Sequence, residues 1–497
     1  MAQITVTNLT FGYEGSPDHV FERLSFQIDT DWKLGFIGRN GKGKTTFLKL
    51  LSGQYEYGGS ISSPAVFDYF PYELNEEEKR NLTIDVAERL EPDFELWKVC
   101  RELSLMNCDA DCLYREFHTL SNGEQTKVML ALLFSKENQF LLIDEPTNHL
   151  DMETRTLVMN YLNGKKGFIL VSHDRAFLDG CIDHVLAFNR ENVEIQQGNF
   201  STWWENKKRQ DTFEQNENEK LRREIKSLQE SARRTARWAD KIEQTKIGFD
   251  PTREERNIST RAYIGEKSKR MQQRRKNLER RQSTAIDEKE GLLKNIEETV
   301  QLKLKVLKFH KDVLIRAKEL VLGYGSKELF EPVDFEVRNG TILAFGGKNG
   351  CGKSSILKRL MGAEIKTQGA LTVAAGLVIS YVPQDASFLC GSLRDFIRES
   401  GIGESLFKAV LRKLDFDRKQ FEKRMEDYSE GQKKKVLLAK SLCTPAHLYI
   451  WDEPLNYIDI FSRMQLEELI TRLKPTMLLV EHDKEFLKNI GAVLVTL

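Results

Sequence analysis

The sequence predicts an α/β fold of two tandem domains joined by a long α-helical hairpin. Four short motifs occur twice in the same order, and the two copies are 308 or 309 residues apart. Between the two sets lies a strand-poor, highly charged segment from residue 206 to about residue 304. A repeat of this length indicates two domains, because solenoid repeats span only roughly 20–50 residues. We therefore expect domains at residues 1–205 and 313–497 and a linker at residues 206–312.

The repeated motifs define the two halves. GRNGKGKT at residues 38–45 (P-loop 1) recurs as GKNGCGKS at 347–354 (P-loop 2), and LSNGEQ at 120–125 (signature 1) recurs as YSEGQ at 428–432 (signature 2). LLIDEP at 141–146 recurs as YIWDEP at 449–454, and VSHD at 171–174 recurs as VEHD at 480–483. Four motifs at one offset make coincidence implausible.

The two halves also carry the pattern of α/β domains. Apolar runs such as LLI before Asp144 and GFILV before Ser172 are typical of buried parallel strands. Each half begins with two strand-like runs, ITVTNLTFGY then SFQI and LVLGY then VDFEV, which we expect to pair in an antiparallel manner. Residues 44–51 are expected to form the helix that follows P-loop 1.

The linker carries two heptad series. The first series steps by alternating four and three residues, through Leu221, Ile225, Leu228, Ala232, Thr235, Ala239 and Ile242. The second series is Met271, Leu278, Ala285 and Leu292. Gly248, Pro251 and Gly265 interrupt the helical pattern between them. The simplest interpretation is two antiparallel helices with a tip loop at about 245–265; one continuous coiled coil in a dimer is the alternative.

Positive charge is concentrated on this linker. Residues 231–281 contain 16 Lys+Arg and 7 Asp+Glu, a net charge of +9, although the whole chain is neutral. Basic residues interleaved with aromatic ones on a protruding arm favour a polyanion such as nucleic acid, and a merely solvated helix face is the alternative. The tip and basic residues expected to contact this partner are Ile247, Phe249, Tyr263, Ile264, Arg270, Arg274, Arg275 and Lys276.

The remaining composition excludes several classes. No apolar run reaches the roughly 18 residues of a membrane span, and the first residues lack the basic and apolar regions of a secretion signal. The seven cysteines are scattered, and the nearest pair, Cys108 and Cys112, has no histidine or second cysteine pair at zinc-ligand spacing. We expect a cytoplasmic protein with buried free thiols and no membrane partner.

The glycine-rich motifs predict two ATP sites. In G-x-x-x-x-G-K-[ST], glycines let backbone N–H groups wrap phosphate oxygens, and the lysine (Lys44 or Lys353) neutralises their charge. The next hydroxyl and a carboxylate at the end of a following strand are typical of Mg²⁺ binding. The residues expected at Mg²⁺ on this basis are Thr45, Asp144, Ser354 and Asp452.

Acidic and imidazole side chains complete the predicted chemistry. Glu145 and Glu453 directly follow the strand-end aspartates, where a carboxylate could orient or polarise an attacking water. His173 and His482 follow the next strand, where an imidazole could contact the γ-phosphate. Tyr13 and Tyr324 stand at matching points and could stack on adenine; packing alone is the alternative.

At these residues the chain resembles ATP-binding cassette domains. LSNGEQ and YSEGQ are similar to the signature of that superfamily, and DEPTNHLD with SHD is similar to its Walker B, D-loop and switch segments. The resemblance implies that the two domains sandwich two ATP molecules, so that Lys44 works with signature 2 and Lys353 with signature 1. It implies a monomer that closes both sites within one chain. The ATP-binding residues implied are Tyr13, Gly38, Arg39, Asn40, Gly41, Lys42, Gly43, Lys44, Thr45, Thr46, Ser121, Asn122, Gly123, Glu124, Gln125, Tyr324, Gly347, Lys348, Asn349, Gly350, Cys351, Gly352, Lys353, Ser354, Ser355, Ser429, Glu430, Gly431 and Gln432.

Two cassettes, a charged helical linker and no membrane segment resemble the ABC-F family of ribosome-binding translation ATPases, over the whole chain. Lys44 to Ser121 spans 77 residues and Lys353 to Ser429 spans 76, which leaves no room for the arm of housekeeping bacterial members. The tip sequence AYIG and the segment DEPLNYID resemble the antibiotic-resistance members of the Lsa type. That resemblance implies binding at the ribosomal E site, near the P-site tRNA, with the linker tip reaching 23S rRNA at the peptidyl-transferase centre. It implies displacement of lincosamide, streptogramin A and pleuromutilin drugs.

The chain departs from the cassette pattern at several positions. Gln384 in YVPQD matches the glutamine that binds Mg²⁺ in this superfamily, but the corresponding YFPYE has Tyr72, a poor neutral ligand. Asn122 replaces a signature glycine, and the second copy has Leu455 and Tyr457 in place of Thr and His. We expect the two ATP sites to be inequivalent.

Other functions stay open on the sequence alone. A housekeeping ABC-F translation factor is one alternative; it would carry the same motifs, but this chain lacks the arm that the bacterial members of that class insert. A detached transporter ATPase is an alternative from another class, although such subunits rarely carry a long basic hairpin. A coiled-coil DNA-repair ATPase would separate its P-loop from its Walker B motif across the coil, whereas here each half carries a complete motif set. Tandem excision-repair ATPases need zinc cysteines, which the sequence lacks.

Overall fold

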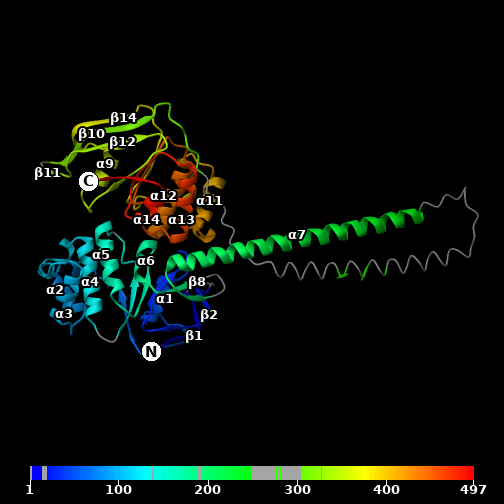
Figure 1. Ribbon diagram of the computed structural model, residues 1–497, viewed down its shortest axis with the longest axis horizontal. Helices are drawn as coiled ribbons and strands as arrows, with labels where there is room; N and C mark the ends of the chain where they lie inside the picture. Colours follow the sequence, from blue (N-terminus) through cyan, green and yellow to red (C-terminus); the bar gives the residue numbers. More distant parts are fainter. Residues whose placement is uncertain are drawn as a thin grey trace, which may run out of the picture. The chain divides into compact units, whose positions relative to one another are not determined.

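The computed structural model describes residues 3–13, 19–136, 139–148, 150–188, 193–247, 304–325 and 327–497, with five single positions between 273 and 281. Two compact units divide the chain. The first is Met1–Trp203 with Val300–Leu497, and the second is Trp204–Thr299. The first unit holds both α/β halves, and the second holds the linker (Figure 1).

The first half contains a mainly parallel sheet and a smaller antiparallel sheet. The larger sheet has the order β5-β6-β7-β3-β8-β9, and its last pair, β8 with β9, is antiparallel. The smaller sheet has the order β2-β1-β4 and is antiparallel. The strands are β1 (Gln3–Phe11), β2 (Phe21–Asp29), β3 (Lys33–Ile37), β4 (Gly58–Ser62), β5 (Val66–Phe70), β6 (Gln139–Asp144), β7 (Phe168–Val171), β8 (His184–Phe188) and β9 (Val193–Gln197). The predicted parallel strands before Asp144 and Ser172 are confirmed as β6 and β7.

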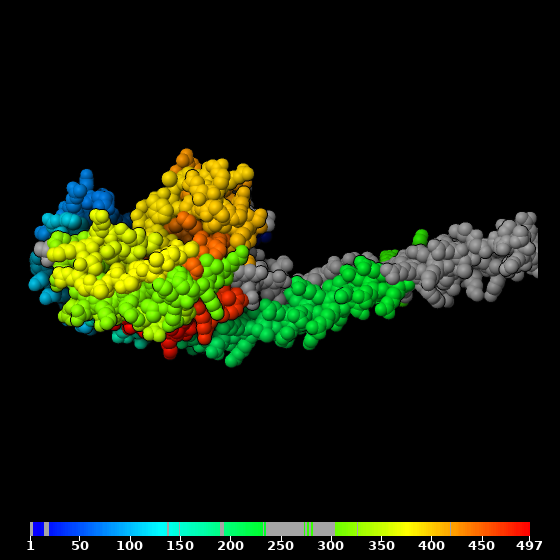
Figure 2. All heavy atoms as spheres, turned by 90° about the horizontal axis from the view of Figure 1, so that it is seen from above, coloured from blue at the N-terminus to red at the C-terminus, as the bar shows by residue number. Residues whose placement is uncertain are grey.

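The second half repeats this plan. Its parallel sheet has the order β15-β16-β17-β13-β18, and β10 pairs in an antiparallel manner with β11, β12 and β14. The strands are β10 (Val313–Tyr324), β11 (Lys327–Glu328), β12 (Val333–Arg338), β13 (Ile342–Gly346), β14 (Lys366–Val373), β15 (Ile379–Val382), β16 (Leu448–Asp452), β17 (Met477–Val480) and β18 (Val493–Thr496). Figure 2 shows the antiparallel sheet (yellow-green) and the helical part around residues 393–413 (orange) as neighbouring lobes.

The helices of the two halves also correspond. In the first half they are α1 (Lys44–Leu51), α2 (Thr83–Leu90), α3 (Leu96–Leu105), α4 (Asn122–Ser135), α5 (Met152–Asn163) and α6 (Arg175–Cys181), with the 3₁₀ turns η1 (Glu78–Arg80), η2 (Ala110–Tyr114) and η3 (Phe117–Thr119). In the second half they are α9 (Lys353–Leu360), α10 (Leu393–Glu399), α11 (Glu404–Lys413), α12 (Glu430–Cys443), α13 (Ile460–Leu473) and α14 (Lys484–Asn489), with η4 (Arg418–Glu422) and η5 (Met425–Asp427).

Polar motif residues start several of these helices. Ser121 caps α4 and forms a capping box with Glu124, and Ser429 does the same for α12 with Gln432. A hydroxyl that accepts from the third backbone N–H satisfies a donor that the helix leaves unpaired. The signature segments are therefore also helix starts, which fixes where their side chains emerge.

Apolar faces of the sheets and helices form the cores. In the first half, Phe36, Phe47 and Phe140 are fully buried together in one cluster between the two sheets and α1. In the second half, Trp451 and Tyr449 of β16 are buried on the face that packs against the helical layer. Because parallel strands are covered on both faces, their continuous apolar runs are explained by burial.

The linker begins with one long helix, α7 (Phe200–Ile247), in agreement with the first predicted heptad series. Phe200 and Trp203 are buried at its start. From residue 204 on, the less exposed positions among its described side chains are 204, 207, 211, 214, 218, 221, 225 and 228, which alternate steps of three and four. Leu221, Ile225 and Leu228 belong to this row, so the predicted seam is confirmed there and begins further towards the N-terminus than the apolar residues indicated. The return helix of the predicted hairpin falls mostly outside the described residues.

Candidate functional site

The two P-loops connect the first central strand of each half to the following helix. Gly43 and Gly352, the residues before α1 and α9, have φ of 85° and 102°, and a Cβ at either would meet a neighbouring apolar side chain within 3.0 Å. Glycine is therefore required at both places. The lysine ammonium groups are buried and donate to carbonyl oxygens of their own loop, Lys44 to Gly38 at 2.7 Å and Lys353 to Gly347 at 2.9 Å.

The predicted Mg²⁺ hydroxyls and carboxylates lie in contact. Thr45 Oγ1 donates to Asp144 Oδ2 at 2.7 Å, and Ser354 Oγ donates to Asp452 Oδ1 at 3.0 Å. The other oxygen of Asp452, Oδ2, is buried without a hydrogen-bond partner among the described residues. Burial raises the pKa of Asp452 to about 6. A buried acidic oxygen that lacks a donor fits a cation, so these residues suit a magnesium-bound nucleotide.

The two tyrosines that are predicted to stack on adenine are exposed, and their hydroxyl groups contact the helices that follow the P-loops. The Tyr13 hydroxyl lies 2.7 Å from the Thr46 hydroxyl, and the Tyr324 hydroxyl lies 3.3 Å from that of Ser355. Their side chains are 46% and 53% exposed, so neither is a core residue. An aromatic ring that is held at its hydroxyl and exposed on its face is available for stacking.

Glu145 and His173 form the predicted catalytic pair of the first half. His173 Nε2 lies 3.4 Å from Glu145 Oε1, and that oxygen has no hydrogen-bond partner within the described part of the chain. Burial, together with repulsion by Asp144, raises the pKa of Glu145 to about 8. Burial also lowers the pKa of His173 well below its usual value, so its imidazole is neutral. Glu145 has φ of 50°, a backbone conformation that is rare for glutamate.

The equivalent pair of the second half has different surroundings. Asn456 Nδ2 donates to Glu453 Oε2 at 2.6 Å, and His482 Nε2 lies 3.7 Å from Glu453 Oε1. Burial alone would raise the pKa of Glu453, but the nearby His482 imidazole and hydrogen bonds from Gln384 and Asn456 together lower it to about 2. The two candidate catalytic glutamates are thus held in opposite ionisation states before any ligand binds.

The position of Tyr72 also differs from that of Gln384. Gln384 reaches Glu453, whereas the Tyr72 hydroxyl donates to Asp68 Oδ2 at 2.9 Å, within its own half. Sequence reasoning missed Tyr69, whose hydroxyl donates to Asp144 Oδ2 at 3.2 Å. The signal was present, because Tyr69 begins the YFPYE segment in the way that Tyr381 begins YVPQD.

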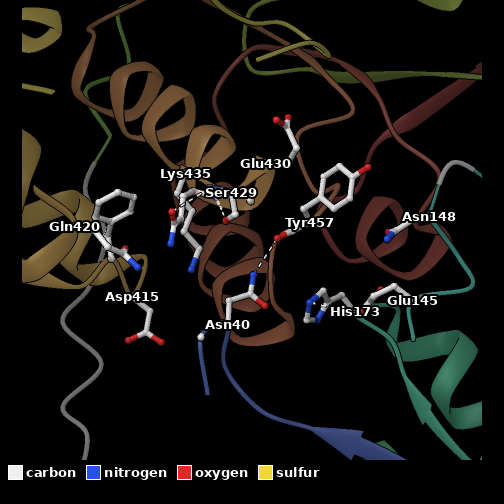
Figure 3. A pocket seen from close by; sticks show the side chains of 14 residues that line it. Asn40, Glu145, Asn148, His173, Asp415, Gln420, Ser429, Glu430, Lys435 and Tyr457 are labelled. Atoms are coloured by element: carbon white, nitrogen blue, oxygen red, sulfur yellow. Dashed lines mark hydrogen bonds and ion pairs between the residues drawn. The ribbon is translucent and has the colours of Figure 1, made fainter. Parts of the chain in front are cut away.

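One cavity combines residues from both halves. It has a volume of about 350 Å³ and is lined by P-loop 1, by the pair Glu145 and His173, and by signature 2. Figure 3 shows Asn40, Glu145 and His173 on one side and Ser429, Lys435 and Tyr457 on the other. The lining residues are Asn40, Gly41, Glu145, Asn148, His173, Asp415, Phe416, Gln420, Ser429, Glu430, Gly431, Gln432, Lys435 and Tyr457. The structure therefore brings the P-loop 1 site together with signature 2.

The corresponding cavity at P-loop 2 is larger and lined differently. It has a volume of about 720 Å³ and includes Gly347, Lys348 and Cys351 with residues 151–153 of the first half. Its described lining does not include residues 121–125, so the expected meeting of Lys353 with signature 1 is not seen in this cavity. In signature 1, Glu124 accepts from Arg115 at 3.2 Å, and Gln125 donates to backbone carbonyls of its own half.

Several contacts between the halves involve residues that the motifs did not single out. Asn40 Nδ2 donates to the carbonyl of Tyr457 at 2.9 Å, and Tyr457 has φ of 62°. Arg39 forms an ion pair with Asp415 at 3.0 Å, and its guanidinium lies 5.6 Å from the ring centroid of Phe461. P-loop 1 is thus bound to the second half through two consecutive side chains.

The replacement of threonine by Leu455 is matched by a second replacement. In the first half, the Thr147 hydroxyl lies 3.2 Å from that of Ser172, and both are buried. In the second half, the equivalent of Ser172 is Glu481, which is 2% exposed and accepts from the backbone N–H groups of His482 at 2.8 Å and Leu455 at 3.3 Å. One carboxylate therefore joins two segments that a pair of hydroxyls joins in the first half.

Other predictions have mixed outcomes. Phe249, Tyr263, Ile264, Arg270, Arg274 and Arg275 lie outside the described residues, as does the side chain of Ile247; Lys276 is helical and exposed. All seven cysteines are free, as expected, but the prediction that they are buried is confirmed only for Cys112, Cys181 and Cys443. Cys100, Cys108 and Cys351 are partly exposed, and Cys390 is exposed in the loop before α10. No helix within the described ranges is long and apolar enough to cross a membrane.

Comparison with known proteins identifies the family. The family model described as "ABC transporter" matches residues 21–148 and 330–456, slightly more than half of the chain. The chain belongs to this ATP-binding cassette family. Each half is therefore a cassette, and the tandem α/β fold predicted from the repeat is confirmed.

Curated relatives span nearly the whole chain. The ribosome protection protein VmlR of Bacillus subtilis (strain 168) is 27% identical, over 98% of this chain and 85% of that protein. ABC transporter F family member 2 of Arabidopsis thaliana is 26% identical, over 98% of this chain and 75% of that protein. These relatives support the ABC-F type of cassette protein. A solved archaeal aABCE1, crystallised in complex with the ribosomal stalk protein aP1, shares the fold with a TM-score of 0.62 and 20% identity, over 98% of this chain and 87% of that one.

Proposed function

We propose that the protein is an ATP-driven ribosome-protection factor that binds the ribosomal E site and displaces lincosamide, streptogramin A and pleuromutilin drugs with its linker tip. The observation that carries the ATPase part is the cavity in which P-loop 1 and Glu145 meet signature 2. The ribosomal part is supported by one relative named for ribosome protection, by the ABC-F likeness and by the net +9 of residues 231–281.

The chemistry follows from the residues of the first cassette. Lys44 and the P-loop 1 backbone hold the phosphates, while Thr45 and Asp144 hold the metal ion. Bound Mg²⁺ supplies charge neutralisation at the phosphates. Glu145 orients the attacking water through its carboxyl oxygen Oε1, which has no hydrogen-bond partner in the described structure. Ser429, at the N-terminus of α12, presents its hydroxyl and the helix dipole to the same cavity.

A housekeeping ABC-F translation factor is the second candidate. Relatives such as ATP-binding protein Uup of Buchnera aphidicola, 26% identical over 98% of this chain, favour it. The described elements between P-loop 1 and signature 1 count against the arm of that class. They correspond to those of the second cassette, with α2 and α3 in place of α10 and α11 and no inserted hairpin in the described stretch.

The experiment that tests the shared part is ribosome co-sedimentation with ATP. The double variant Glu145→Gln with Glu453→Gln is expected to slow hydrolysis by about 10²-fold or more and to remain on ribosomes. Lys44→Ala with Lys353→Ala is the matched control, because it removes phosphate binding and is expected to abolish retention. If the glutamine variant hydrolyses ATP normally or does not sediment with ribosomes, the proposal fails.

Cell-free translation with a pleuromutilin separates the two candidates. Replacing residues 245–265 by a short Gly-Ser turn is expected to leave ATP hydrolysis and ribosome binding intact and to abolish protection. The basis is that aromatic side chains such as those in the tip sequence stack on bases with roughly 1–3 kcal/mol each. Equal protection by the shortened protein refutes the tip mechanism, and no protection by the intact protein favours the housekeeping factor.

A further inference from the structure

Two cysteine thiols lie in contact beside signature 1. Cys108 follows α3, and Cys112 lies in η2; their sulfur atoms are 3.8 Å apart. Cys112 is 4% exposed, whereas Cys108 is half-buried and so is accessible to a small reagent. A disulfide has a sulfur–sulfur distance of about 2.05 Å, so closure needs the sulfurs to approach by roughly 2 Å.

The internal repeat relates these thiols to two residues that line the cavity at P-loop 1. Cys108 and Cys112 stand 308 residues before Phe416 and Gln420, the same offset that separates Asp144 from Asp452. Phe416 and Gln420 line the cavity between P-loop 1 and signature 2. The local structures also match, because Asp109 caps η2 in the way that Asp417 caps η4. The thiols therefore occupy the position beside signature 1 that corresponds to this cavity wall beside signature 2.

The thiol pair is joined to signature 1 through Arg115. The Arg115 backbone N–H donates to the carbonyl of Cys112 at 3.4 Å, and its guanidinium donates to Glu124 Oε1 at 3.2 Å. Glu124 in turn accepts from the backbone N–H of Ser121 at 2.8 Å. A change in the position of η2 is therefore passed directly to the capping box that holds the signature serine.

The two thiols differ in reactivity. The hydrogen bond with Cys112 and the charge of Lys127 lower the pKa of Cys108, although burial opposes this. The hydrogen bond with Cys108 and burial raise the pKa of Cys112. Cys108 is thus the sulfur that reacts first, since the thiolate is the nucleophile.

We propose that Cys108 and Cys112 are an oxidant-responsive dithiol that closes to a disulfide with hydrogen peroxide and thereby slows ATP turnover at signature 1. The Cys108 thiolate attacks one peroxide oxygen, which breaks the O–O bond and gives a sulfenic acid and, after protonation, water. The Cys112 sulfur then attacks the sulfenic sulfur, the S–S bond forms, and a second water leaves. In total two thiols and one peroxide give one disulfide and two waters.

One tryptic peptide reports the modification. Cleavage after Arg101 and Arg115 releases residues 102–115, which contain both Cys108 and Cys112. In the full-length protein with Cys390→Ser, which removes the exposed thiol, mild peroxide is expected to make this peptide lighter by two hydrogen atoms. Dithiothreitol is expected to reverse the change. A peptide that instead gains oxygen at both thiols, or remains unchanged, overturns the proposal.

The effect on turnover is measured in parallel and rests on the proposed ATPase function. Peroxide is expected to lower the ATPase rate about two-fold, since one of two sites is affected, and dithiothreitol is expected to restore it. The variants Cys108→Ser and Cys112→Ser keep their full rate under peroxide. An unchanged rate in protein whose peptide is fully disulfide-bonded overturns the link to signature 1. A protein without any ATPase activity contradicts the proposed function and leaves the peptide result to decide on the disulfide.

Discussion

Replacing Glu145 by glutamine is expected to stabilise the ligand-free protein, whereas the same replacement at Glu453 is expected to destabilise it. The two residues occupy equivalent places in the repeat, so each is the control for the other. Their surroundings differ, because Glu145 is buried beside Asp144 and Glu453 accepts a hydrogen bond from Asn456. The opposite signs follow from the pKa of each carboxyl.

Glu145 has a pKa of about 8 in the folded protein, above its ordinary value of 4.5. The stability that its neutral form contributes is fully present below pH 4.5 and is lost as the pH rises through 8. The glutamine variant stays neutral throughout. Its advantage over the wild type in free energy of unfolding is therefore expected to widen by about 1.4 kcal/mol per pH unit between these limits.

Glu453 has a pKa of about 2 in the folded protein, below its ordinary value of 4.5. Its contribution to stability is present above pH 4.5 and is lost as the pH falls through 2. The glutamine variant is therefore expected to be less stable by about 3 kcal/mol, and this deficit should not change between about pH 6 and pH 9.

Differential scanning calorimetry of the ligand-free protein at several pH values measures both effects, with the transitions of the two cassettes fitted separately. A change of 1 kcal/mol shifts the Tm of a domain of this size by about 2–4 °C. The advantage of Glu145→Gln should thus grow by several degrees from pH 6 to pH 8, and the deficit of Glu453→Gln should stay constant. A pH-independent difference for Glu145→Gln, or stabilisation by Glu453→Gln, refutes the reasoning.

Two further predictions concern the second cassette and the linker. Glu481→Ser alone leaves the buried N–H groups of His482 and Leu455 without their acceptor. This variant is expected to lower the Tm of the second cassette by about 5 °C or more. Adding Leu455→Thr should restore part of the lost Tm, because it rebuilds the hydroxyl pair of the first cassette. No decrease in the single variant, or no recovery in the double, counts against the pairing. Neutralising four basic residues should flatten the salt dependence of ribosome binding, measured by sedimentation at several salt concentrations. The slope of log K against log salt should change by roughly one for each phosphate that the protein no longer neutralises. An unchanged slope assigns the charge of these residues to a solvated face. The four residues are Arg270, Arg274, Arg275 and Lys276.

The repeat made most of the fold predictable. Motif residues such as Lys44 and Asp144 mark where a strand ends and a helix begins, so locating them also locates the central parallel strands. The second set of motifs then tests the assignment of the first set, because an equal spacing between corresponding motifs cannot arise from local secondary-structure propensity. The row of less exposed positions on α7 was only partly predictable, since positions 207, 211, 214 and 218 are polar and no apolar period marks them.

The electrostatic difference between the two sites could not be read from the motifs. Glu145 and Glu453 sit in the same DEP triplet, and Asn148 and Asn456 are also equivalent, yet only Asn456 is seen to donate to its glutamate. Such a difference depends on side-chain rotamers and burial, which sequence spacing does not specify. The sequence shows that Glu481 in VEHD replaces the serine of VSHD. Only the structure shows that its carboxylate accepts a hydrogen bond from the Leu455 backbone N–H.

The contact of Arg39 with Phe461 connects P-loop 1 to the first turn of α7 through a short chain of side chains. Phe461, which Arg39 covers, lies 6.4 Å from the Trp203 ring centroid, and Trp203 stands in the first turn of α7. The 48 residues of that helix correspond to a length of about 70 Å, at 1.5 Å per residue. A tilt of ~5° at the base of a stiff rod of that length displaces its far end by ~6 Å. A side-chain movement too small to alter either cassette could therefore be amplified to atomic dimensions at the end of the helix.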